Sequence, residues 1–475
     1  MEKTFLIVTL GCKVNQYESD RLARELADMG MVAAKPGEAA DCVVVNTCTV
    51  TGRAAQQSGQ AVRAALRNHP GAKVIAAGCH AQAAPELFAA IPGLSAVCGT
   101  SCREKLSALA SSLAAGDAPP SRPLVLHGSM DASPFADPGL RPVSGKRSRP
   151  FLKIQDGCNA RCSYCAVPDA RGPSRSMPEE AVRRQLALLF RAGYGEVVLT
   201  GIHLGAWGLD LSPGTSLARL LESLARSPET PRLRISSIEP CELSPEIVAL
   251  ARDSGRICPH FHLPLQSGDD EILSLMRRPY TSSRYAEIAA GVRAALPGAA
   301  IGADVMAGFP GETDASFARA FDFIEGLPVT YLHVFPFSPR EGTPASSFGG
   351  RPEAAAVKER CAALRELSRR KKAEFFASLV GSSVEICVEG RSAGSDSTQH
   401  SENMDEADRS NFERSISERS GAEPGGPPAL PYKGLTGNYA PVEFFSTQAL
   451  APGTIVRGIV VAAPPGRALF AKLVH

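Results

Sequence analysis

Short, continuously apolar segments that alternate with helix-like stretches constrain the fold of this chain more than any other feature. In the first 115 residues these segments are Thr4–Leu10, Cys42–Asn46 and Lys73–Ala77, and each precedes a predicted helix. Strands that are apolar along their whole length and separated by helices are typical of a parallel sheet covered on both faces. The sequence therefore predicts an α/β fold that begins, over residues 1–115, with a parallel α/β sheet domain.

The same alternation returns on a larger scale over residues 151–377. Six parallel strands joined by right-handed crossovers would form an open or incomplete (β/α)6 barrel. Residues 116–150 lie between the two domains; their repeated prolines and lack of helical periodicity predict an extended linker. The six predicted strands are Phe151–Gln155, Glu196–Gly201, Leu233–Ile238, His260–Gln266, Ile301–Met306 and Tyr331–Phe337.

A third pattern begins at residue 378 and extends to residue 475. Short β-type runs at Ser383–Val388, Ala440–Phe445 and Thr454–Ala462 predict a small β domain. Residues 391–431 interrupt it and are rich in Ser, Asp, Glu and Gly but poor in large apolar side chains. Such a segment cannot bury enough surface to order itself, so the sequence predicts a disordered insertion there.

Composition limits the kind of protein this can be. The 475 residues carry 51 basic and 49 acidic side chains, a net charge of +2, which excludes binding of nucleic acid by bulk charge but allows a local basic patch. No apolar run approaches the roughly 18 residues of a membrane span, and the N-terminus becomes polar too early for a signal peptide. We expect a cytoplasmic protein with no membrane partner. In that reducing compartment, an odd total of 13 cysteines favours metal binding over disulfides.

The most specific motif is Cys158-Asn-Ala-Arg-Cys162-Ser-Tyr-Cys165, directly after the first predicted strand of the central domain. Three thiolates on one short loop can ligate three irons of a 4Fe–4S cluster, whereas ordinary electron-transfer clusters use four cysteines. The fourth iron would stay open to a substrate or cofactor, as in catalytic zinc sites that keep an open position. A zinc site or three incidental thiols are the alternatives.

A second set of cysteines follows the first three predicted strands: Cys12, Cys48 and Cys79. The loops after parallel strands open at the same carboxyl edge of a sheet, so these thiols could converge in space. Each could instead be a small buried apolar residue. Beside an open-cluster motif, a second three-cysteine cluster is the favoured interpretation.

These motifs also carry a family resemblance. The Cys158–Cys165 spacing resembles that of radical S-adenosylmethionine (SAM) enzymes. The stretches GCKVNQYES (11–19), NTCTV (46–50) and GCHAQ (78–82) resemble the N-terminal signature of the methylthiotransferases, and residues 156–175 resemble their radical-SAM core. The stretch GLTGNYAPV (434–442) resembles an OB-like TRAM barrel.

The resemblance implies a reaction and its participants. It implies two 4Fe–4S clusters, held by the two cysteine triads, and SAM. The Lys-Val-Asn form after Cys12 is most similar to enzymes that insert a methylthio group at carbon 2 of N6-threonylcarbamoyladenosine at tRNA position 37. Alternatives within the family are isopentenyladenosine in tRNA or a ribosomal-protein aspartate. An alternative of another class is a noncatalytic iron–sulfur electron-transfer or RNA-binding protein.

Further residues and partners follow from the same resemblance. The partners would be the tRNA anticodon loop and a reductant such as flavodoxin or ferredoxin, while the sulfur donor stays unspecified. No catalytic side chain beyond the cluster ligands is predicted. The run 369–372 (RRKK) is either a solvated helix face or a phosphate contact, and Tyr432 and Tyr439 are candidate base-stacking platforms. The implied SAM contacts, each alternatively a turn or cap residue, are Tyr164, Thr200, Gly201, Ser236, Glu239 and Gln266.

Overall fold

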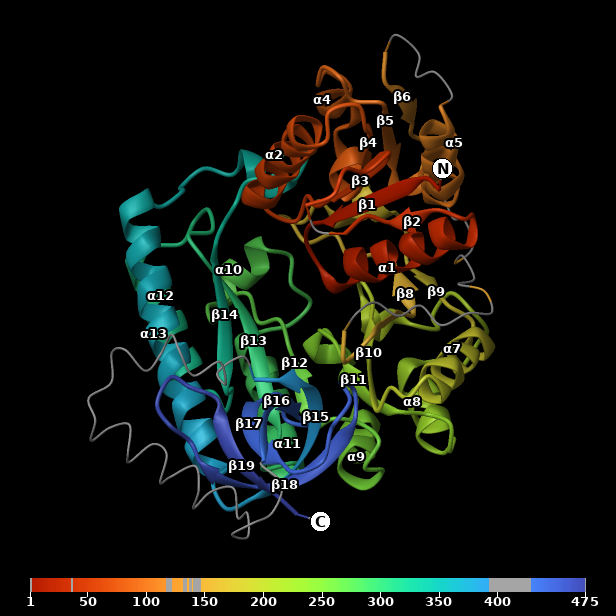
Figure 1. Cartoon of the computed structure of the whole chain (residues 1–475). Coiled ribbons are helices and arrows are strands. Elements are labelled where there is room, and N and C mark those ends of the chain that lie inside the picture. The colour runs from red at the N-terminus through yellow and green to blue at the C-terminus, as the bar shows by residue number, and fades with distance from the viewer. Residues whose placement is uncertain are drawn as a thin grey trace, which may run out of the picture.

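The computed structural model describes residues 2–35, 37–116, 122–130, 135, 139, 147–392 and 429–474. The N-terminal part is a six-stranded parallel sheet in the order β2-β1-β3-β4-β5-β6 (Figure 1). Its strands are β1 (Thr4–Thr9), β2 (Val32–Ala33), β3 (Cys42–Thr47), β4 (Lys73–Gly78), β5 (Ala96–Gly99) and β6 (Leu124–Leu126). Its α-helices are α1 (Lys13–Asp28), α2 (Gly52–Asn68), α3 (Cys79–Ala83), α4 (Pro85–Ala89) and α5 (Leu106–Ala115).

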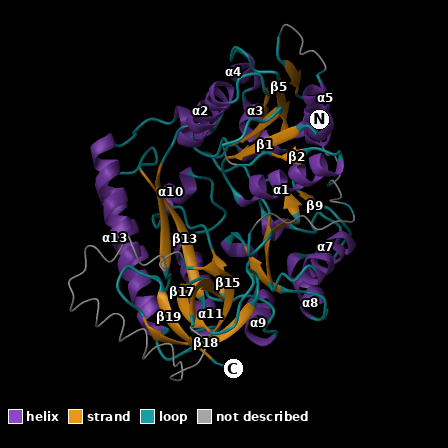
Figure 2. Ribbon diagram, in the orientation of Figure 1, coloured by secondary structure: helices purple, strands orange, loops and turns teal. Residues whose placement is uncertain are grey.

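Helices cover both faces of this sheet, as the apolar strands predict (Figure 2). Strand β3 is buried along its whole length, and its side chains alternate between two separate apolar cores. Val44 packs into the core that contains Leu26 of α1 and Leu113 of α5. Val43 and Val45 pack into the core on the opposite face, with side chains from α2 and α4.

Strand β6 lies inside the stretch that the sequence predicts to be an extended linker. It pairs with β5 in parallel, with Leu124 opposite Ala96, so the sheet reaches further along the chain than residue 115. The sequence pattern does not reveal this three-residue strand, because the prolines around it interrupt helical and strand periodicity on both sides. Most of the other linker residues lie outside the described part of the chain.

The central part contains two three-stranded parallel sheets, β7-β10-β11 and β12-β13-β14. The Ile238 amide donates to the His262 carbonyl at 3.0 Å, which joins β11 to β12. No pairing in the described residues joins β7 to β14, so the barrel is incomplete, as predicted. The strands are β7 (Phe151–Lys153), β10 (Glu196–Thr200), β11 (Arg232–Ile235), β12 (His260–His262), β13 (Ala300–Ala307) and β14 (Tyr331–Pro336).

A short antiparallel pair, β8 (Gln155–Asp156) and β9 (Arg175–Ser176), flanks the cysteine loop at the barrel mouth. The long helix α13 runs along one side of the molecule towards the C-terminal part (Figure 1). No helix in the described residues is long and apolar enough to cross a membrane. The remaining α-helices are α6 (Val167–Arg171), α7 (Glu179–Arg191), α8 (Leu217–Ala225), α9 (Pro245–Asp253), α10 (Asp270–Leu275), α11 (Ser282–Ala295), α12 (Asp314–Gly326) and α13 (Ala354–Ser378).

The C-terminal part is a closed five-stranded barrel in the order β15-β16-β17-β19-β18. Arg391 of β15 pairs with Tyr432 of β16, so both edges of the predicted 391–431 insertion belong to strands. The intervening residues 393–428 lie outside the described part of the chain. The prediction of Tyr432 as an exposed platform is wrong, because its ring is buried in the barrel core. The strands are β15 (Ser383–Arg391), β16 (Leu430–Thr436), β17 (Pro441–Ser446), β18 (Ile455–Ala462) and β19 (Leu469–Leu473).

A buried carboxylate joins the C-terminal barrel to the amino ends of the central strands. Glu196 is 0% exposed and pairs with Arg232 at 2.5 Å and with Arg234 at 2.7 Å. Arg234 also donates to the Thr436 and Gly437 carbonyls, each at 2.9 Å, in the turn between β16 and β17. Glu196 therefore holds in place the arginine that attaches the C-terminal barrel.

Removing this carboxylate should be costly. In Glu196→Ala, the Arg232 and Arg234 guanidiniums remain buried without their counter-charge, so we expect a loss of about 3–5 kcal/mol in the free energy of unfolding. Urea denaturation followed by the fluorescence of Trp207, the single tryptophan and a buried core residue, measures it. The matched control is Glu229→Ala, whose carboxylate pairs with Arg191 on the surface, and it should cost at most about 1 kcal/mol. Equal losses in the two variants would contradict this role.

Glu196 also predicts an acid sensitivity. Burial by itself raises the pKa of this carboxyl, but Arg234 and Arg232 outweigh burial and lower the pKa to about 2. A carboxyl with a lowered folded-state pKa contributes stability that is present above its ordinary pKa of about 4.3 and lost as the pH falls through the folded value. The stability difference between the wild type and Glu196→Gln should stay constant above about pH 5.5 and shrink as the pH falls towards 2. Parallel stability curves over the whole range would contradict the expectation.

Candidate functional site

The first cysteine triad lies at the carboxyl ends of three adjacent parallel strands. Cys12 follows β1 and precedes α1, Cys48 follows β3, and Cys79 begins α3 directly after β4. Burial raises the pKa of the Cys79 thiol to about 11; nearby Arg171 lowers it, whereas Cys12 and Cys48 raise it. The structure therefore brings the three predicted thiols together.

A glycine permits the close approach of two of these loops. Gly11 has φ +94°, and a Cβ atom built on it would lie 2.5 Å from the Cys48 sulfur. A larger residue would be strained by its backbone angle and would collide with the thiol. Gly11 therefore lets the loop that carries Cys12 lie directly against Cys48.

Asn15 connects the loops of this edge. Its side chain is 0% exposed, and its amide nitrogen donates to the Leu10 carbonyl at 2.8 Å and to the Thr47 carbonyl at 3.0 Å. Its amide oxygen accepts a hydrogen bond from Arg171 at 2.7 Å. One buried side chain thus satisfies backbone groups at the ends of β1 and β3 and contacts the central domain.

The second triad lies on the loop between β8 and α6. Gly157, at φ +73°, starts the loop, and a Cβ atom there would lie 1.9 Å from the Pro173 carbonyl oxygen. The Gln155 side chain donates to the Asp156 and Gly157 carbonyls at 3.0 and 2.8 Å. The Cys158 amide donates to the Gly172 carbonyl at 3.0 Å. These contacts fix the loop at its base.

Two positively charged or protonatable groups contact these thiols. His203 Nδ1 lies 3.4 Å from the Cys158 sulfur, and its Nε2 lies 2.7 Å from Glu242. Burial lowers the pKa of His203, but its hydrogen bonds with Cys158 and Glu242 outweigh burial and raise the pKa to about 10. Arg278 donates to the Cys162 sulfur at 3.4 Å. Both contacts hold a nitrogen of a neighbouring side chain against a sulfur of the triad.

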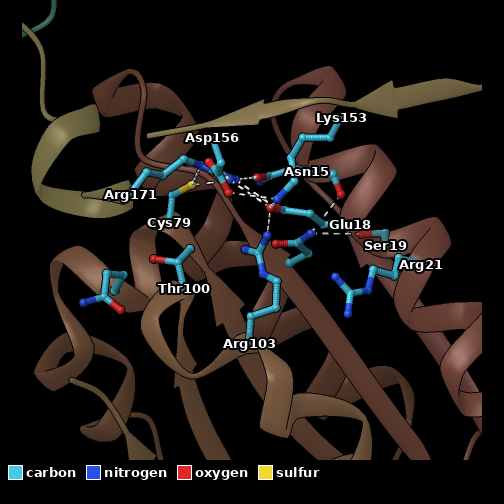
Figure 3. Close-up of polar contacts among 12 residues, drawn as sticks. Asn15, Glu18, Ser19, Arg21, Cys79, Thr100, Arg103, Lys153, Asp156 and Arg171 are labelled. Carbon is cyan, nitrogen blue, oxygen red and sulfur yellow. Dashed lines mark hydrogen bonds and ion pairs between the residues drawn. The ribbon is translucent and has the colours of Figure 1, made fainter. Parts of the chain in front are cut away.

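The two triads are linked through Arg171, which is 1% exposed (Figure 3). Its Nε donates to the Cys79 sulfur at 3.1 Å, and its other nitrogens donate to both Glu18 carboxylate oxygens and to Asp156. Lys153 donates to Glu18 and Asp156, each at 2.8 Å. Burial lowers the pKa of Lys153 to about 7, although Asp156 opposes the shift. This buried network fixes the first triad against the loop of the second.

Three of the predicted SAM contacts lie where a ligand could approach the strand ends. Thr200 is buried at the end of β10, and a Cβ atom on the next residue, Gly201, would lie 2.8 Å from the Gln155 side chain. Gln266 has φ +71°, and its buried amide oxygen has no hydrogen-bond partner in the described structure. An unpaired buried acceptor is costly, so Gln266 suits a polar ligand, whereas the space beside Gly201 is filled by Gln155.

The other three predicted contacts have different surroundings. Tyr164 packs edge-on against Phe309, with ring centroids 6.5 Å apart. Glu239 pairs with Arg278, the arginine that contacts Cys162. Ser236 lies on the wall of a second space, described next.

We use the term lateral cavity for a space of about 600 Å³ that all three parts of the chain line. It contains Phe151 of β7 and Tyr331 of β14, the unpaired edge strands of the barrel, and it therefore occupies the lateral gap. Asp304 in its wall lies 3.1 Å from His262 Nε2 and 3.3 Å from His333 Nδ1. Its lining also includes Lys13, Ser236, His260, Lys433 and Tyr439.

Sequence reasoning assigned no role to several of these residues. Arg171, His203 and Arg278 act through contacts with cysteines 92, 45 and 116 residues away, which no local pattern reveals.

Two residues of the basic run of α13 form contacts within the protein. Arg370 pairs with Glu325, and Lys371 donates to the Glu325 and Leu327 carbonyls at the end of α12.

The spacing of the thiols bears on the zinc alternative. In the described residues, the only group of three ligands mutually within 4.8 Å is His262, Asp304 and His333, so neither cysteine triad is that compact. A zinc ion holds each sulfur at about 2.3 Å, which requires a compact set. Neither triad in the described residues is compact enough for that geometry, and nitrogens of Arg171, His203 and Arg278 contact the sulfurs of Cys79, Cys158 and Cys162.

Comparison with known proteins identifies the family of this chain. The Radical SAM superfamily model matches residues 152–324, and that of uncharacterized protein family UPF0004 matches residues 4–99. The threonylcarbamoyladenosine tRNA methylthiotransferase MtaB of Bacillus subtilis is 37% identical over 80% of this chain and 84% of its own length. The chain belongs to the radical-SAM methylthiotransferase family.

Other relatives of this methylthiotransferase are named for two different modified nucleosides. MtaB of Thermotoga maritima is 35% identical over 82% of this chain and 87% of its own. The tRNA-2-methylthio-N(6)-dimethylallyladenosine synthase of Erythrobacter litoralis is 32% identical over 82% and 86%. A solved structure of the radical SAM methyltransferase TsrM from Kitasatospora setae, with cobalamin and a [4Fe-4S] cluster bound, shares the fold, with a TM-score of 0.55 and 17% identity over 73% of this chain and 77% of its own.

The family membership decides between two classes of function. Its members are enzymes, and the family uses 4Fe–4S clusters and SAM. The alternative of a noncatalytic electron carrier or RNA-binding protein is therefore rejected. The fold also agrees with the expected architecture of parallel sheet, incomplete barrel and small closed β-barrel.

We expect the hydrogen bonds of the Asn15 side chain at this edge of the sheet to contribute measurably to the free energy of unfolding. Asn15→Ala leaves the Leu10 and Thr47 carbonyls and one Arg171 donor without this partner, and buried unsatisfied groups cost about 1–3 kcal/mol. We expect a loss of that size in urea denaturation. Gln16→Ala, a half-buried neighbour on the same helix, is the control and should change stability by at most about 0.5 kcal/mol. A loss confined to Gln16→Ala would contradict the assignment.

Proposed function

We propose that this methylthiotransferase inserts a methylthio group at carbon 2 of N6-threonylcarbamoyladenosine at position 37 of tRNA. The observation that carries the reaction is the convergence of two three-cysteine sites at facing strand ends, linked by Arg171. The substrate assignment is supported by the relatives. MtaB of Bacillus subtilis, named for threonylcarbamoyladenosine, shares 37% identity with this chain, and a synthase of Moorella thermoacetica named for dimethylallyladenosine shares 33%.

The two triads would hold one 4Fe–4S cluster each. Cys158, Cys162 and Cys165 would leave an iron open beside the strand ends of the barrel, and Cys12, Cys48 and Cys79 would form the second site. When bound, the clusters and SAM supply the electron transfer, hydrogen abstraction and sulfur that the insertion requires.

The side chains of the chain itself bind and orient these groups. His203 and Arg278 contact the sulfurs of Cys158 and Cys162 and so orient these proposed ligands. Gln266 offers an unpaired acceptor, and Gly201 also lies at the strand ends, packed against the Gln155 side chain. With Tyr164, Thr200, Ser236 and Glu239, these residues form the proposed SAM site.

The proposed macromolecular partner is the anticodon loop of tRNA. Bases in a loop are extruded at modest cost, which suits an enzyme that acts on a base edge. Tyr439 is exposed and stacks on His260 at 4.3 Å in the lateral cavity, where a base could also stack. A reductant protein such as flavodoxin or ferredoxin would supply electrons; the structure does not specify the sulfur donor.

Two substrates within the family compete with this proposal: isopentenyladenosine in tRNA and a ribosomal-protein aspartate. The relatives named for dimethylallyladenosine favour the first of these as the second candidate. Nucleoside mass spectrometry of tRNA from a strain that lacks this gene distinguishes them. We expect loss of the methylthio form of threonylcarbamoyladenosine with retention of that of isopentenyladenosine; the reverse pattern would refute the substrate assignment.

The two triads predict separable defects. Anaerobic reconstitution of the wild type should give about eight irons per chain, and Cys158→Ala or Cys48→Ala should give about four. Cys158→Ala should abolish SAM cleavage, whereas Cys48→Ala should cleave SAM but insert no sulfur. Cys241→Ala is the control, since this exposed thiol belongs to neither triad. Full methylthiolation by Cys48→Ala would disprove the second site.

A further inference from the structure

The lateral cavity extends from the reaction centre to the C-terminal barrel. Lys13 directly follows Cys12, and Ser236 lies at the end of β11, whereas Lys433 and Tyr439 come from β16 and the turn that follows it. A group that enters between β7 and β14 therefore meets side chains of all three parts of the chain. The substituent that distinguishes the candidate nucleosides would lie against these walls.

The arginines that line this cavity already form ion pairs with carboxylates of the protein. Arg147 pairs with Asp20 at 2.6 Å and Arg149 with Glu389 at 2.6 Å. Arg234 is held by Glu196 and by two carbonyls. Within the described residues, the ammonium groups of Lys13 and Lys433 have neither a hydrogen bond nor an ion pair. Of the two, Lys13 is adjacent to the cysteine triad.

Asp304, the carboxylate whose charge acts most strongly on Lys13, is already hydrogen-bonded elsewhere. Asp304 contacts His262 and His333, and Ser237 lies 2.7 Å from His262 Nδ1 and so orients that ring. Asp304 can therefore accept a hydrogen bond from a ligand while the Lys13 ammonium, exposed in the cavity, binds an anion. The wall presents a cation and an acceptor side by side.

The threonylcarbamoyl substituent matches this pair of groups. It carries a carboxylate, a hydroxyl and a carbamoyl N–H, whereas a dimethylallyl group has no polar atom. An apolar substituent would remove water from Lys13 and Asp304 without replacing its hydrogen bonds, and sites built for polar groups reject such analogues strongly.

We propose that Lys13 determines substrate specificity by binding the carboxylate of the threonylcarbamoyl group, with Asp304 accepting a hydrogen bond from its hydroxyl or carbamoyl N–H. This inference rests on the proposed function. Lys13 is a substrate-binding residue on the wall of the site and takes no part in cluster ligation.

The test compares reconstituted wild type, Lys13→Met, Lys13→Arg and Lys358→Met on two tRNAs, one with threonylcarbamoyladenosine and one with isopentenyladenosine at position 37. Mass spectrometry of the methylthio nucleosides gives kcat/KM for each. Loss of one charged hydrogen bond should lower kcat/KM of Lys13→Met on the first tRNA by about 10- to 100-fold, mainly through KM. Lys13→Arg should recover part of the loss, and Lys358→Met, an exposed lysine of α13 outside the cavity lining, should keep the wild-type ratio of the two substrates.

Removing the negative charge of the threonylcarbamoyl carboxylate from the substrate tests the contribution of that charge separately. Wild-type enzyme should lose about the same factor when the carboxylate of the modified tRNA is converted to its methyl ester, and Lys13→Met should not distinguish acid from ester. Iron content and SAM cleavage without tRNA should be unchanged in Lys13→Met, which separates substrate binding from damage to the triad. Discrimination of acid from ester by Lys13→Met at the wild-type level would overturn the inference. Failure of the wild type on the first tRNA, with activity on the second, would instead overturn the proposed function.

Discussion

The contacts of Arg171 determine how the parts of this enzyme fit together. A buried guanidinium is costly unless its donors are satisfied, and here they are satisfied by Glu18 on α1, Asp156 on β8 and the Cys79 sulfur. The acceptors come from two different domains, so neither domain alone can pair this charge. The interface is therefore fixed in the arrangement that sets the two cysteine triads against each other.

That interface follows from a general property of parallel sheets. Ligands bind at the carboxyl ends of the strands, and here the carboxyl edges of the N-terminal sheet and of the incomplete barrel face each other. The C-terminal barrel contacts the opposite ends: Gly453 accepts from the Gly195 amide before β10, and Asn438 donates to the Gly298 carbonyl before β13. Its residues Lys433 and Tyr439 line the lateral cavity that leads towards the reaction centre.

Much of the fold can be predicted from the sequence because the buried strands are continuous apolar runs. Strands β1, β3 and β4 of the sheet and β10 of the barrel have this signal, whereas charged or polar residues interrupt it in β11 (RLRI) and β12 (HFH), and β16 (LPYKGLT) contains Pro431, Lys433 and Gly434. The cysteine triads can be predicted for related reasons, one from local spacing and one from strand ends. Arg171 and Arg278 cannot, because they act on cysteines that are 92 and 116 residues away, and such distant contacts exist only in the folded chain.

The same structure suggests where specificity can change without loss of chemistry. The atom modified, carbon 2 of the adenine, is common to both proposed nucleosides, so the cysteine loops and the SAM site serve either one equally. The substrates differ only in the group on N6, and the surface that meets it is the wall of the lateral cavity. A wall that pairs the free ammonium of Lys13 with the acceptor Asp304 favours a polar, anionic substituent, while an apolar side chain at position 13 would remove that preference. Specificity would then depend on a few side chains around a constant reaction centre, which is consistent with substrates of two kinds in the names of relatives at 37% and 32% identity.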